Sequence, residues 1–213
     1  MWFRDAYPFE MLSKSILADI ASKSRSLRVW SAACSSGQEP YSIAMTFLEF
    51  KQKNPTAFPG GIEIIATDLS SEMLTKAQTA TYDNLSIARG LSEQRKKMFF
   101  KASTNANGLF SLNHEVKKLV KFRSLNLLES YQSLGKFDLI FCRNVLIYFA
   151  PPIKTKILQQ IAAALQSGGK LFLGASESVT GITDEFNMVR CNPGLYFSKK
   201  TTKKQLVRNH FLK

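Results

Sequence analysis

Residues 27–41 read Leu-Arg-Val-Trp-Ser-Ala-Ala-Cys-Ser-Ser-Gly-Gln-Glu-Pro-Tyr. A short apolar strand ends there in a run of small residues, and Pro40 favours the first turn of a helix, where its missing N–H is not needed. Small side chains let the backbone approach a bound nucleotide-like ligand closely, as in the binding turns of α/β proteins. An ordinary tight turn between a strand and a helix has a similar composition. Other parts of the sequence are therefore needed to distinguish a ligand-binding turn from an ordinary one.

The composition is that of a globular chain with one main domain. With 213 residues, 45% of them apolar and 16 of them Phe, the chain can bury a full core. No apolar run reaches the roughly 18 residues of a membrane helix, and the N-terminus lacks the apolar centre of a signal peptide. We therefore expect a cytoplasmic protein that does not insert into a membrane.

The numbers and positions of cysteine and histidine show whether a disulfide framework or a zinc site is indicated. The cysteines are Cys34, Cys142 and Cys191, which are far apart and odd in number, and only two histidines accompany them. This pattern indicates neither a disulfide framework nor a zinc site. We expect buried thiols and no metal.

Positive charge is unevenly distributed along the chain. The formal net charge is +13, and six Lys and Arg residues without an acidic residue lie in 199–213, which leaves +7 for the rest. We predict a folded domain over 1–198 and a loosely ordered basic tail over 199–213. A basic surface suits nucleic acid, an anionic membrane face or an acidic protein, and charge alone does not choose among them.

Helical and strand patterns alternate along the chain. Apolar spacing of three to four residues predicts helices over 10–24, 40–50, 82–100 and 151–165, the last ended by Ser167-Gly168-Gly169. Apolar and β-branched runs predict sheet strands over 27–30, 62–68, 119–125, 137–142 and 170–174, and a closing hairpin over 186–190 and 195–197. The alternation predicts an α/β fold with a mostly parallel sheet and a C-terminal antiparallel hairpin.

A small β subdomain is predicted within this alternation, at about 101–118. Residues 104–108 read Thr-Asn-Ala-Asn-Gly, which is typical of a turn, and partly alternating runs follow over 109–113 and 116–122. We therefore expect an antiparallel β insertion before the third sheet strand.

Asp68 stands at the C-terminal end of the second predicted sheet strand. Its two carboxylate oxygens match the two neighbouring hydroxyls of a ribose, so this position suits nucleotide binding in a βαβ unit. A turn residue or a helix cap is the alternative interpretation. Ser70 is expected to cap the helix that follows.

Four stretches spread along the chain have specific sequences. They are Phe3-Arg4-Asp5, WSAACSSGQEPYS over 30–42, Ala66-Thr67-Asp68 and FDLIFCRNVLIYF over 137–149, with Gly174-Ala175-Ser176-Glu177 as a weaker fifth. Together they resemble the CheR-type chemotaxis receptor methyltransferases, which esterify glutamate side chains. The resemblance implies a Rossmann-like class I methyltransferase fold with a small β subdomain inserted before the fourth strand. It also implies a protein-glutamate O-methyltransferase with S-adenosylmethionine as cofactor and S-adenosylhomocysteine as product.

The resemblance assigns cofactor contacts to individual positions. Arg4 would pair with the carboxylate of the cofactor's methionine part, Glu39 would hold its polar end, and Asp68 would bind the ribose hydroxyls. Further implied contacts are Ala33 and Gly37 in the small-residue turn, and Asn126 and Leu127 in the adenine region.

The resemblance also places three residues after the fourth strand at the reaction centre. Arg143 and Asn144 would lie beside the methionine moiety, and Arg143 and Tyr148 would be the catalytic residues, with Tyr148 close to the transferred methyl group. The alternatives are a solvated strand-end charge for Arg143 and a core position for Tyr148.

Two features depart from the family pattern. Family members usually carry a helical N-terminal domain and cofactor contacts just before the Phe-Arg pair, whereas this sequence starts at Met1, so we expect a fragment or a shortened form with weaker binding. Members that dock on a receptor's C-terminal pentapeptide have arginines after the glycine turn of the β insertion. Ser111 and Asn113 occupy that stretch here, which makes pentapeptide tethering doubtful.

The resemblance implies that the partner is an acidic cytoplasmic helix of a chemotaxis receptor, which suits a basic surface. A nucleic-acid methyltransferase on the same fold is one alternative. Amino-methylating enzymes of that kind have an Asp/Asn-Pro-Pro-Tyr/Phe motif where this chain has Cys142-Arg143-Asn144-Val145, so no nucleic-acid partner is expected. A truncated, non-catalytic module that only binds receptors is the other alternative.

Overall fold

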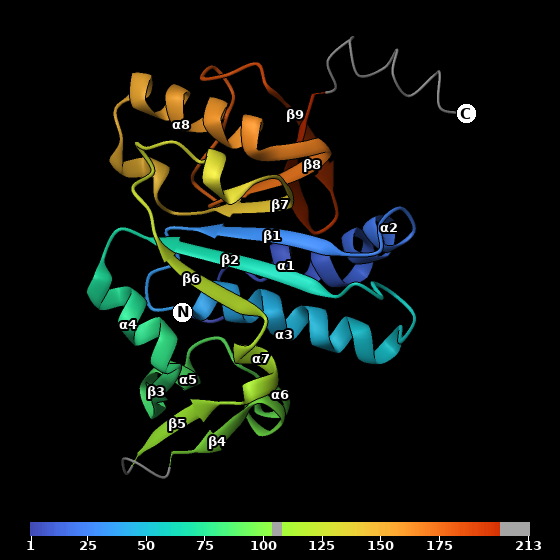
Figure 1. The fold of residues 1–213 in the computed structure, drawn as a ribbon, viewed down its shortest axis with the longest axis vertical. Helices are drawn as coiled ribbons and strands as arrows, with labels where there is room; N and C mark the ends of the chain where they lie inside the picture. Colours follow the sequence, from blue (N-terminus) through green and yellow to red (C-terminus); the bar gives the residue numbers. More distant parts are fainter. Residues whose placement is uncertain (104–107, 201–213) are drawn as a thin grey trace.

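The computed structural model describes residues 1–103 and 108–200 and is built around one large sheet (Figure 1). Its strands are β1 (Leu27–Ala32), β2 (Ile62–Asp68), β6 (Val120–Ser124), β7 (Phe137–Cys142), β8 (Leu165–Leu173), β9 (Phe186–Cys191) and β10 (Gly194–Lys199). Within the described residues these seven strands follow the order β6-β2-β1-β7-β8-β10-β9. The first five in this order run parallel, and β10 pairs antiparallel with β8 and β9. The predicted mostly parallel sheet with a C-terminal hairpin is confirmed.

Helices cover both faces of this sheet, with α3 (Gln38–Lys53) on one side and α8 (Pro151–Ala164) on the other (Figure 1). Successive strand residues therefore enter different cores. Val29 of β1 packs in the core that contains α3, and its neighbour Trp30 packs in the core that contains α8. In β7, Leu139 and Ile140 divide in the same way. Burial on both faces explains why consecutive residues at the centres of these strands are apolar, without alternation.

Shorter helical segments complete the face of the sheet that α3 covers. The predicted helix over 10–24 consists of three consecutive pieces, namely α1 (Tyr7–Met11), a π-helical turn (Leu12–Ile16) and α2 (Leu17–Ala21). α4 (Ser71–Thr79) follows β2 and contacts β2 and β6. The Oγ of Ser70 accepts a hydrogen bond from the Met73 N–H at 3.2 Å, so Ser70 caps α4 as predicted.

A second, antiparallel sheet lies at the far end of the molecule from α8 (Figure 1). Its order is β3-β5-β4, with β3 (Thr81–Asp83), β4 (Phe100–Ala102) and β5 (Leu109–Leu112). The inserted sheet is present, but the prediction of one helix over 82–100 was wrong. That stretch contains β3, α5 (Asn84–Ala88) and α6 (Glu93–Phe99). Asp83 and Ser92 each accept a hydrogen bond from the N–H three residues later and so start a new helix.

Two other sequence-based boundaries also need correction. A short helix, α7 (His114–Lys117), replaces the start of the alternation predicted over 116–122. Ser167-Gly168-Gly169 does not end α8, which stops at Ala164; this tripeptide lies inside β8, next to an irregularity in its register with β7. Gly168 has a φ of +72°, a backbone conformation that favours glycine.

Parts of two predicted segments lie outside the described residues. These are positions 104–107 of the predicted turn and positions 201–213 of the predicted basic tail. Lys199, by contrast, belongs to β10, and the backbone N–H of Lys200 donates to the carbonyl of Glu185 at 2.9 Å. The first two residues of the predicted tail are therefore held by the sheet, Lys199 as the last residue of β10 and Lys200 directly after it.

The described cysteines are free thiols in different surroundings. Cys34 and Cys142 are buried, and burial raises the pKa of both thiols, whereas Cys191 is exposed and corrects the expectation of a buried thiol there. In residues 1–103 and 108–200, no group of His, Cys, Asp and Glu is arranged to hold a metal ion. No helix in these ranges has the length and apolar character needed to cross a membrane.

Candidate functional site

The predicted site residues lie in loops at the C-terminal ends of the parallel strands. β1 leads into the small-residue turn, β2 ends at Asp68, and β7 leads into Arg143 and Asn144. Because β2, β1 and β7 are neighbours in the sheet, these loops meet at one edge. Ligands of open α/β sheets bind at this edge.

The turn after β1 has a backbone that demands small residues. Ala33 and Ser35 have φ values of 57° and 50°, and Gly37 has a φ of 88°. A Cβ added to Gly37 would lie 2.9 Å from the Cβ of Ala77 in α4, closer than real side chains approach. Gly37 is therefore required both by its own backbone and by the close packing of α4.

Asp68 braces this turn from the neighbouring strand. Its Oδ2 accepts a hydrogen bond from the Ser35 N–H at 2.7 Å, and its Oδ1 accepts one from the Ser70 N–H at 2.9 Å. A carboxylate oxygen can accept more than one hydrogen bond, so both oxygens keep capacity for a hydroxyl donor. Asp68 is therefore a turn residue, which was one interpretation of the sequence. Its free acceptor capacity is compatible with the other interpretation, a contact with ribose hydroxyls.

Arg143 is the buried centre of the site. Only 5% of its surface is exposed, which excludes the alternative of a solvated strand-end charge. Its Nη1 donates to Oε2 of Glu39 at 3.0 Å, and its Nη2 donates to Oδ2 of Asp5 and to the carbonyl of Arg4, both at 2.7 Å. One guanidinium thereby joins the end of β7 to α3 and to the N-terminal segment.

Glu39, in the first turn of α3, is held from both sides. Its Oε1 accepts a hydrogen bond from the hydroxyl of Ser31 at 2.8 Å, and its Oε2 faces Arg143. Burial raises the pKa of Glu39 above its ordinary value of 4.5, while the nearby charge of Arg143 opposes that rise. The pKa of Glu39 is therefore set by two opposing effects, the loss of water around its carboxylate and the attraction of Arg143.

Replacing Glu39 by Gln should change how the free energy of unfolding depends on pH. Because the folded-state pKa of Glu39 is raised, its contribution to stability is fully present below the ordinary 4.5 and is lost as pH rises through the folded pKa. The free energy of unfolding of the wild type should thus fall relative to that of Glu39→Gln between pH 4.5 and neutrality. Denaturant titrations of both proteins across that range measure the difference. A difference that instead grows with pH would show that Arg143 outweighs burial.

The carboxylate of Glu177 organises the loop after β7. Its oxygens accept hydrogen bonds at 2.7–3.3 Å from backbone N–H groups of this loop and of the end of β8; the donors are Asn144, Val145, Leu146, Ile147 and Gly174. Asn144 has a φ of 58°, a conformation that this anchoring helps to hold. In the sequence, Glu177 was marked only as the end of the weakest matching stretch.

The N-terminal segment that carries Arg4 has a strained backbone. Phe3, Asp5 and Ala6 have φ values of 45°, 65° and 44°. Each left-handed residue of this kind costs on the order of 1–2 kcal/mol, so such a conformation persists only where surrounding contacts hold it. Here the N–H of Trp2 donates to the Arg89 carbonyl and the N–H of Phe3 donates to Ser42 Oγ, both at 3.1 Å.

These elements enclose a cavity of about 220 Å³. Its lining includes predicted site residues from the N-terminal segment, the turn after β1, the first turn of α3 and the end of β7, namely Arg4, Ala33, Glu39, Arg143 and Asn144. Asn126 and Leu127 follow β6 at the same edge of the sheet, outside this lining. Leu127 is buried, and Asn126 Oδ1 accepts a hydrogen bond from the Leu128 N–H at 3.0 Å.

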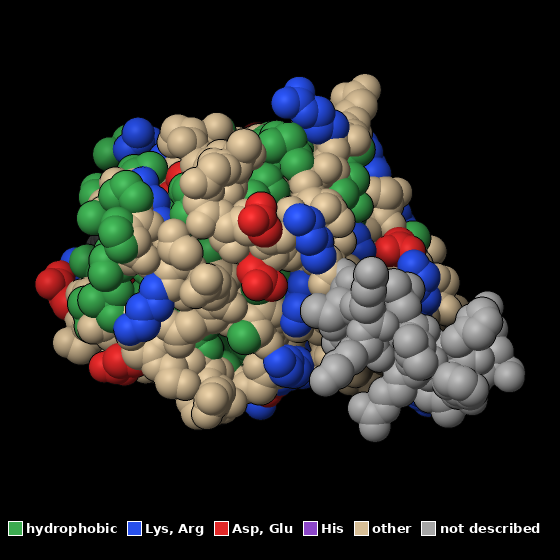
Figure 2. Space-filling view, turned by 90° about the horizontal axis from the view of Figure 1, so that it is seen from above, with side chains coloured by type: hydrophobic (Ala, Val, Ile, Leu, Met, Phe, Trp, Pro, Cys, Tyr) green, Lys and Arg blue, Asp and Glu red, His purple; other side chains and the backbone are tan. Residues whose placement is uncertain are grey.

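Tyr148 lies outside the lining as well, on the loop after β7. Its side chain is 79% exposed, so the alternative of a core position was wrong. Ile147 beside it is 47% exposed. Figure 2 shows hydrophobic side chains gathered at the left end of the molecule, where α8 begins in Figure 1. The loop after β7 therefore offers apolar surface next to the site.

The residues at and beside the cavity fit the cofactor that the sequence implies. The Nε of Arg143 is buried and has no hydrogen-bond partner among the described residues, so a donor there is unsatisfied. In the lining, Arg4 adds a positive charge for a carboxylate and Glu39 a negative charge for an ammonium group. Asp68 lies outside the lining, but it is bonded to Ser35 of the lining and adds acceptors for a diol. S-adenosylmethionine carries all three of these groups.

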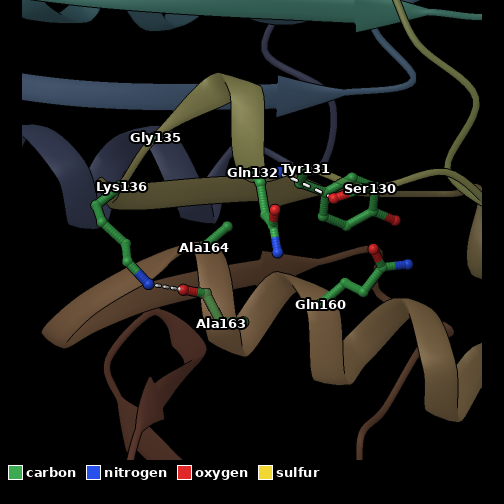
Figure 3. A pocket seen from close by; sticks show the side chains of 8 residues that line it. All are labelled: Ser130, Tyr131, Gln132, Gly135, Lys136, Gln160, Ala163 and Ala164. Atoms are coloured by element: carbon green, nitrogen blue, oxygen red, sulfur yellow. Dashed lines mark hydrogen bonds between the residues drawn. The ribbon is translucent and has the colours of Figure 1, made fainter.

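A larger cavity, of about 310 Å³, lies elsewhere (Figure 3). It is formed between the segment before β7, with Gln132 and Lys136, and the last turns of α8, with Gln160 and Ala163. Lys136 Nζ donates to the Ala163 carbonyl across it. None of the predicted site residues lines this cavity, which faces the opposite end of β7 from Arg143.

Comparison with known proteins gives a family match over most of the chain. The model described as "CheR methyltransferase, SAM binding domain" matches residues 1–195. All the residues that line the 220 Å³ cavity fall inside this match.

Curated relatives agree with the family match. A "Chemotaxis protein methyltransferase" of Vibrio anguillarum is 54% identical over 200 residues, covering 94% of this chain and 72% of the relative. "Chemotaxis protein methyltransferase Cher2" of Pseudomonas putida is 48% identical over 202 residues, covering 94% and 73%. Among solved structures, a TehB-like SAM-dependent methyltransferase from Corynebacterium glutamicum is 16% identical, with a TM-score of 0.49 and 88% of each chain covered.

Proposed function

The chain belongs to the CheR methyltransferase family, and from that premise we propose that it esterifies glutamate side chains on the acidic cytoplasmic helices of chemotaxis receptors. It is an S-adenosylmethionine-dependent methyltransferase of chemotaxis, as the matching family model and relatives are. The observation that carries the proposal is the buried Arg143, which gathers Glu39, Asp5 and Arg4 below the small-residue turn.

Each side of the site would take a different part of the cofactor. Arg4 and Arg143 would face the carboxylate of the methionine part, and Glu39 its ammonium group. Asp68 would accept hydrogen bonds from the ribose hydroxyls without losing its bonds to the turn. Ala33, Gly37 and Asn144 would contribute backbone surface, and Asn126 and Leu127, at the end of β6, would border the adenine.

The proposed reaction needs little chemistry from the side chains. When bound, the cofactor supplies a methyl group activated by a positively charged sulfur. A glutamate carboxylate is ionised at neutral pH, because its ordinary pKa is about 4.3, so no general base is required. The chain contributes alignment and the exclusion of water. Tyr148, exposed on the loop after β7, would contact the incoming acceptor.

Two features of the chain suit an acidic helical partner. The full sequence carries a formal net charge of +13, and the loop after β7 exposes Ile147 and Tyr148. Positive charge raises the rate at which an acidic receptor helix is encountered, and the apolar side chains give it contact area. Both features favour receptor methylation in the cytoplasm.

Tethering to a receptor pentapeptide is not part of this proposal. Ser111 of β5 exchanges a hydrogen bond with the hydroxyl of Thr81 in β3 at 3.2 Å. The Nδ2 of Asn113 donates to the Met98 carbonyl at 2.7 Å. Both side chains hold the small sheet together, which supports a structural role at the positions where docking members carry arginines.

An alkali test separates this function from the alternatives. Receptor membranes and duplex DNA are incubated separately with methyl-labelled cofactor, and the products are treated with mild base. Label on the receptor that is released as methanol is expected, because a glutamate methyl ester hydrolyses there whereas methyl on a base nitrogen survives. Alkali-stable label would contradict carboxylate methylation, and cofactor binding with no transfer to either substrate would favour a non-catalytic module.

Salt should slow the same reaction. At an ionic strength of about 0.15 M the screening length is about 8 Å, so attraction between a basic enzyme and an acidic helix weakens as salt rises further. We expect the second-order rate of receptor methylation to fall between about 0.05 M and 0.5 M salt, with the cofactor affinity as control. A rate that does not change with salt would remove the role given to surface charge.

Asp68→Ala should weaken cofactor binding by roughly five- to 150-fold, because two hydrogen bonds worth on the order of 1–3 kcal/mol together are lost. Asp68→Asn is the companion variant, since its one amide oxygen can keep the bond to the Ser35 N–H while the acceptor for the Ser70 N–H is lost. Calorimetric titration with S-adenosylhomocysteine measures both variants. Unchanged affinity in Asp68→Ala would exclude the diol contact.

A further inference from the structure

We infer that Arg95, in the helix that leads into the small β sheet, is a positioning residue for the cofactor site. It holds Phe3 and thereby places Arg4 and Asp5 against Arg143. The inference rests on the proposed role of the site around Arg143 in binding the cofactor. Arg95 itself is outside the lining of that cavity.

Arg95 makes two contacts that suit only an arginine. Its Nε and Nη2 donate to the two carboxylate oxygens of Glu49, in α3, at 2.7 and 2.9 Å. Its guanidinium carbon lies 3.8 Å from the centre of the Phe3 ring. The side chains of Arg95 and Glu49 are only 29% and 24% exposed, so both contacts are partly shielded from water. A planar fork that is paired and stacked at once cannot be replaced by lysine without loss.

The Phe3 ring is thus fixed between two neighbours. Besides the cation, Phe3 contacts Phe9 in an edge-to-face arrangement with 5.1 Å between ring centres. Its φ of 45° is unfavourable for a bulky residue, so the position depends on its contacts. Removing the cation frees one face of the ring and allows the backbone to relax towards an ordinary conformation.

Relaxation at Phe3 would be felt directly at the cofactor site. The next two residues present the carbonyl of Arg4 and the carboxylate of Asp5 to Arg143. Trp2, on the other side, is anchored to the small sheet through Tyr82 and Phe100, with ring centres 4.9 and 5.3 Å away. The inserted subdomain and its leading helix therefore hold the segment that completes the site.

The main test is Arg95→Met, which keeps the length of the side chain and removes the cation. We expect the dissociation constant for S-adenosylhomocysteine, measured by calorimetry, to rise about tenfold, as loss of one partly shielded contact predicts. The KM for S-adenosylmethionine should rise by a similar factor. The kcat and the KM for receptor should change less than about twofold, a split that a general loss of stability would not produce.

Arg28→Met is the matched control, because Arg28 repeats the same chemistry away from the site. Its Nε donates to Glu63 at 2.8 Å, and its guanidinium lies 4.8 Å from the ring centre of Phe137. It stands at the start of β1, at the opposite edge of the sheet from Arg143. This variant should lower the denaturation midpoint and leave the dissociation constant of S-adenosylhomocysteine unchanged.

A double-mutant cycle with Phe3→Leu gives a second measurement. If Arg95 acts through the Phe3 ring, adding Arg95→Met to Phe3→Leu should cause little further loss of affinity. Should Arg95→Met fold poorly, Glu49→Gln, which loosens Arg95 and keeps its charge, is expected to raise the dissociation constant about threefold.

Wild-type affinity in Arg95→Met or in Glu49→Gln would overturn the inference while leaving the proposed function intact. Additive losses in the cycle would overturn it as well. A wild-type protein that binds no cofactor would contradict the proposed function first.

Discussion

Arg143→Met is expected to lower the free energy of unfolding by about 3–5 kcal/mol, the cost of leaving a buried charge without its partner. Arg143 is 5% exposed and forms ion pairs with both Glu39 and Asp5. Its loss leaves Glu39 unpaired beside a neutral thioether, and the Arg4 carbonyl loses its donor. Cofactor affinity should fall roughly 10- to 150-fold, since the proposed charge-assisted contact of Arg143 with the cofactor carboxylate, worth about 1.5–3 kcal/mol, disappears. Denaturant unfolding and calorimetric titration measure the two effects.

Two further variants separate the effect of the charge of Arg143 from that of its guanidinium geometry and from the loss of any arginine. Arg143→Lys keeps the charge but not the fork, so it should recover part of the stability and little of the affinity. Arg123→Met removes an exposed arginine from β6 and should change stability by no more than about 0.5 kcal/mol. Arg143→Met with wild-type stability would show that the buried network is not what holds the N-terminal segment to the sheet.

Glu177→Ala is expected to destabilise the protein by roughly 2–4 kcal/mol and to lower kcat by about tenfold or more. The variant removes the acceptor shared by consecutive N–H groups of the loop after β7 and by the N–H of Gly174. Water can replace some of the lost hydrogen bonds at the exposed end of the loop, but not the one to the N–H of the buried Leu146. The loop that places Asn144 and Tyr148 should then lose its single conformation. Unfolding titrations and steady-state kinetics test both effects.

Glu177→Gln distinguishes an acceptor from a space-filling side chain. Its amide NH2 group would face backbone N–H donors. We therefore expect the loss of stability in this variant to be at least half of that in Glu177→Ala. Glu129→Ala, at an exposed acidic residue in the loop after β6, is the control and should behave as wild type. A Glu177→Gln protein as stable and active as wild type would contradict the anchoring role.

Several elements could be predicted from the sequence because their signals are local. β2 and β7 have the bounds predicted, 62–68 and 137–142, since each has an apolar centre and a polar residue at or just after its C-terminal end. Ser70 caps α4 as its chemistry indicates. The small-residue turn could also be predicted, because its composition is typical of a tight turn, and Ala33, Ser35 and Gly37 do take positive φ values there.

Other elements depend on distant partners and could not be predicted in this way. β3 is a strand because Thr81–Asp83 pairs with Leu109–Leu112, which comes much later in the chain. Nothing within 82–100 indicates that pairing, and the helical pattern there hides the restarts at Asp83 and Ser92. Gly168 and Gly169 were predicted to end the preceding helix, because the sequence does not show that they lie inside β8, where its register with β7 is irregular.

The sequence, through the family resemblance, marked Arg4, Glu39, Asp68 and Arg143 one by one. Only the tertiary structure shows that Arg143 pairs with Glu39, 104 positions away, and with Asp5, 138 positions away. Glu177 and Arg95 gain their roles solely from what the fold brings beside them, as single charged residues that leave no pattern in a sequence. Hydrophobic period and turn chemistry are properties of neighbours along the chain, whereas the meeting of charges depends on strand order, which is decided when the whole sheet packs.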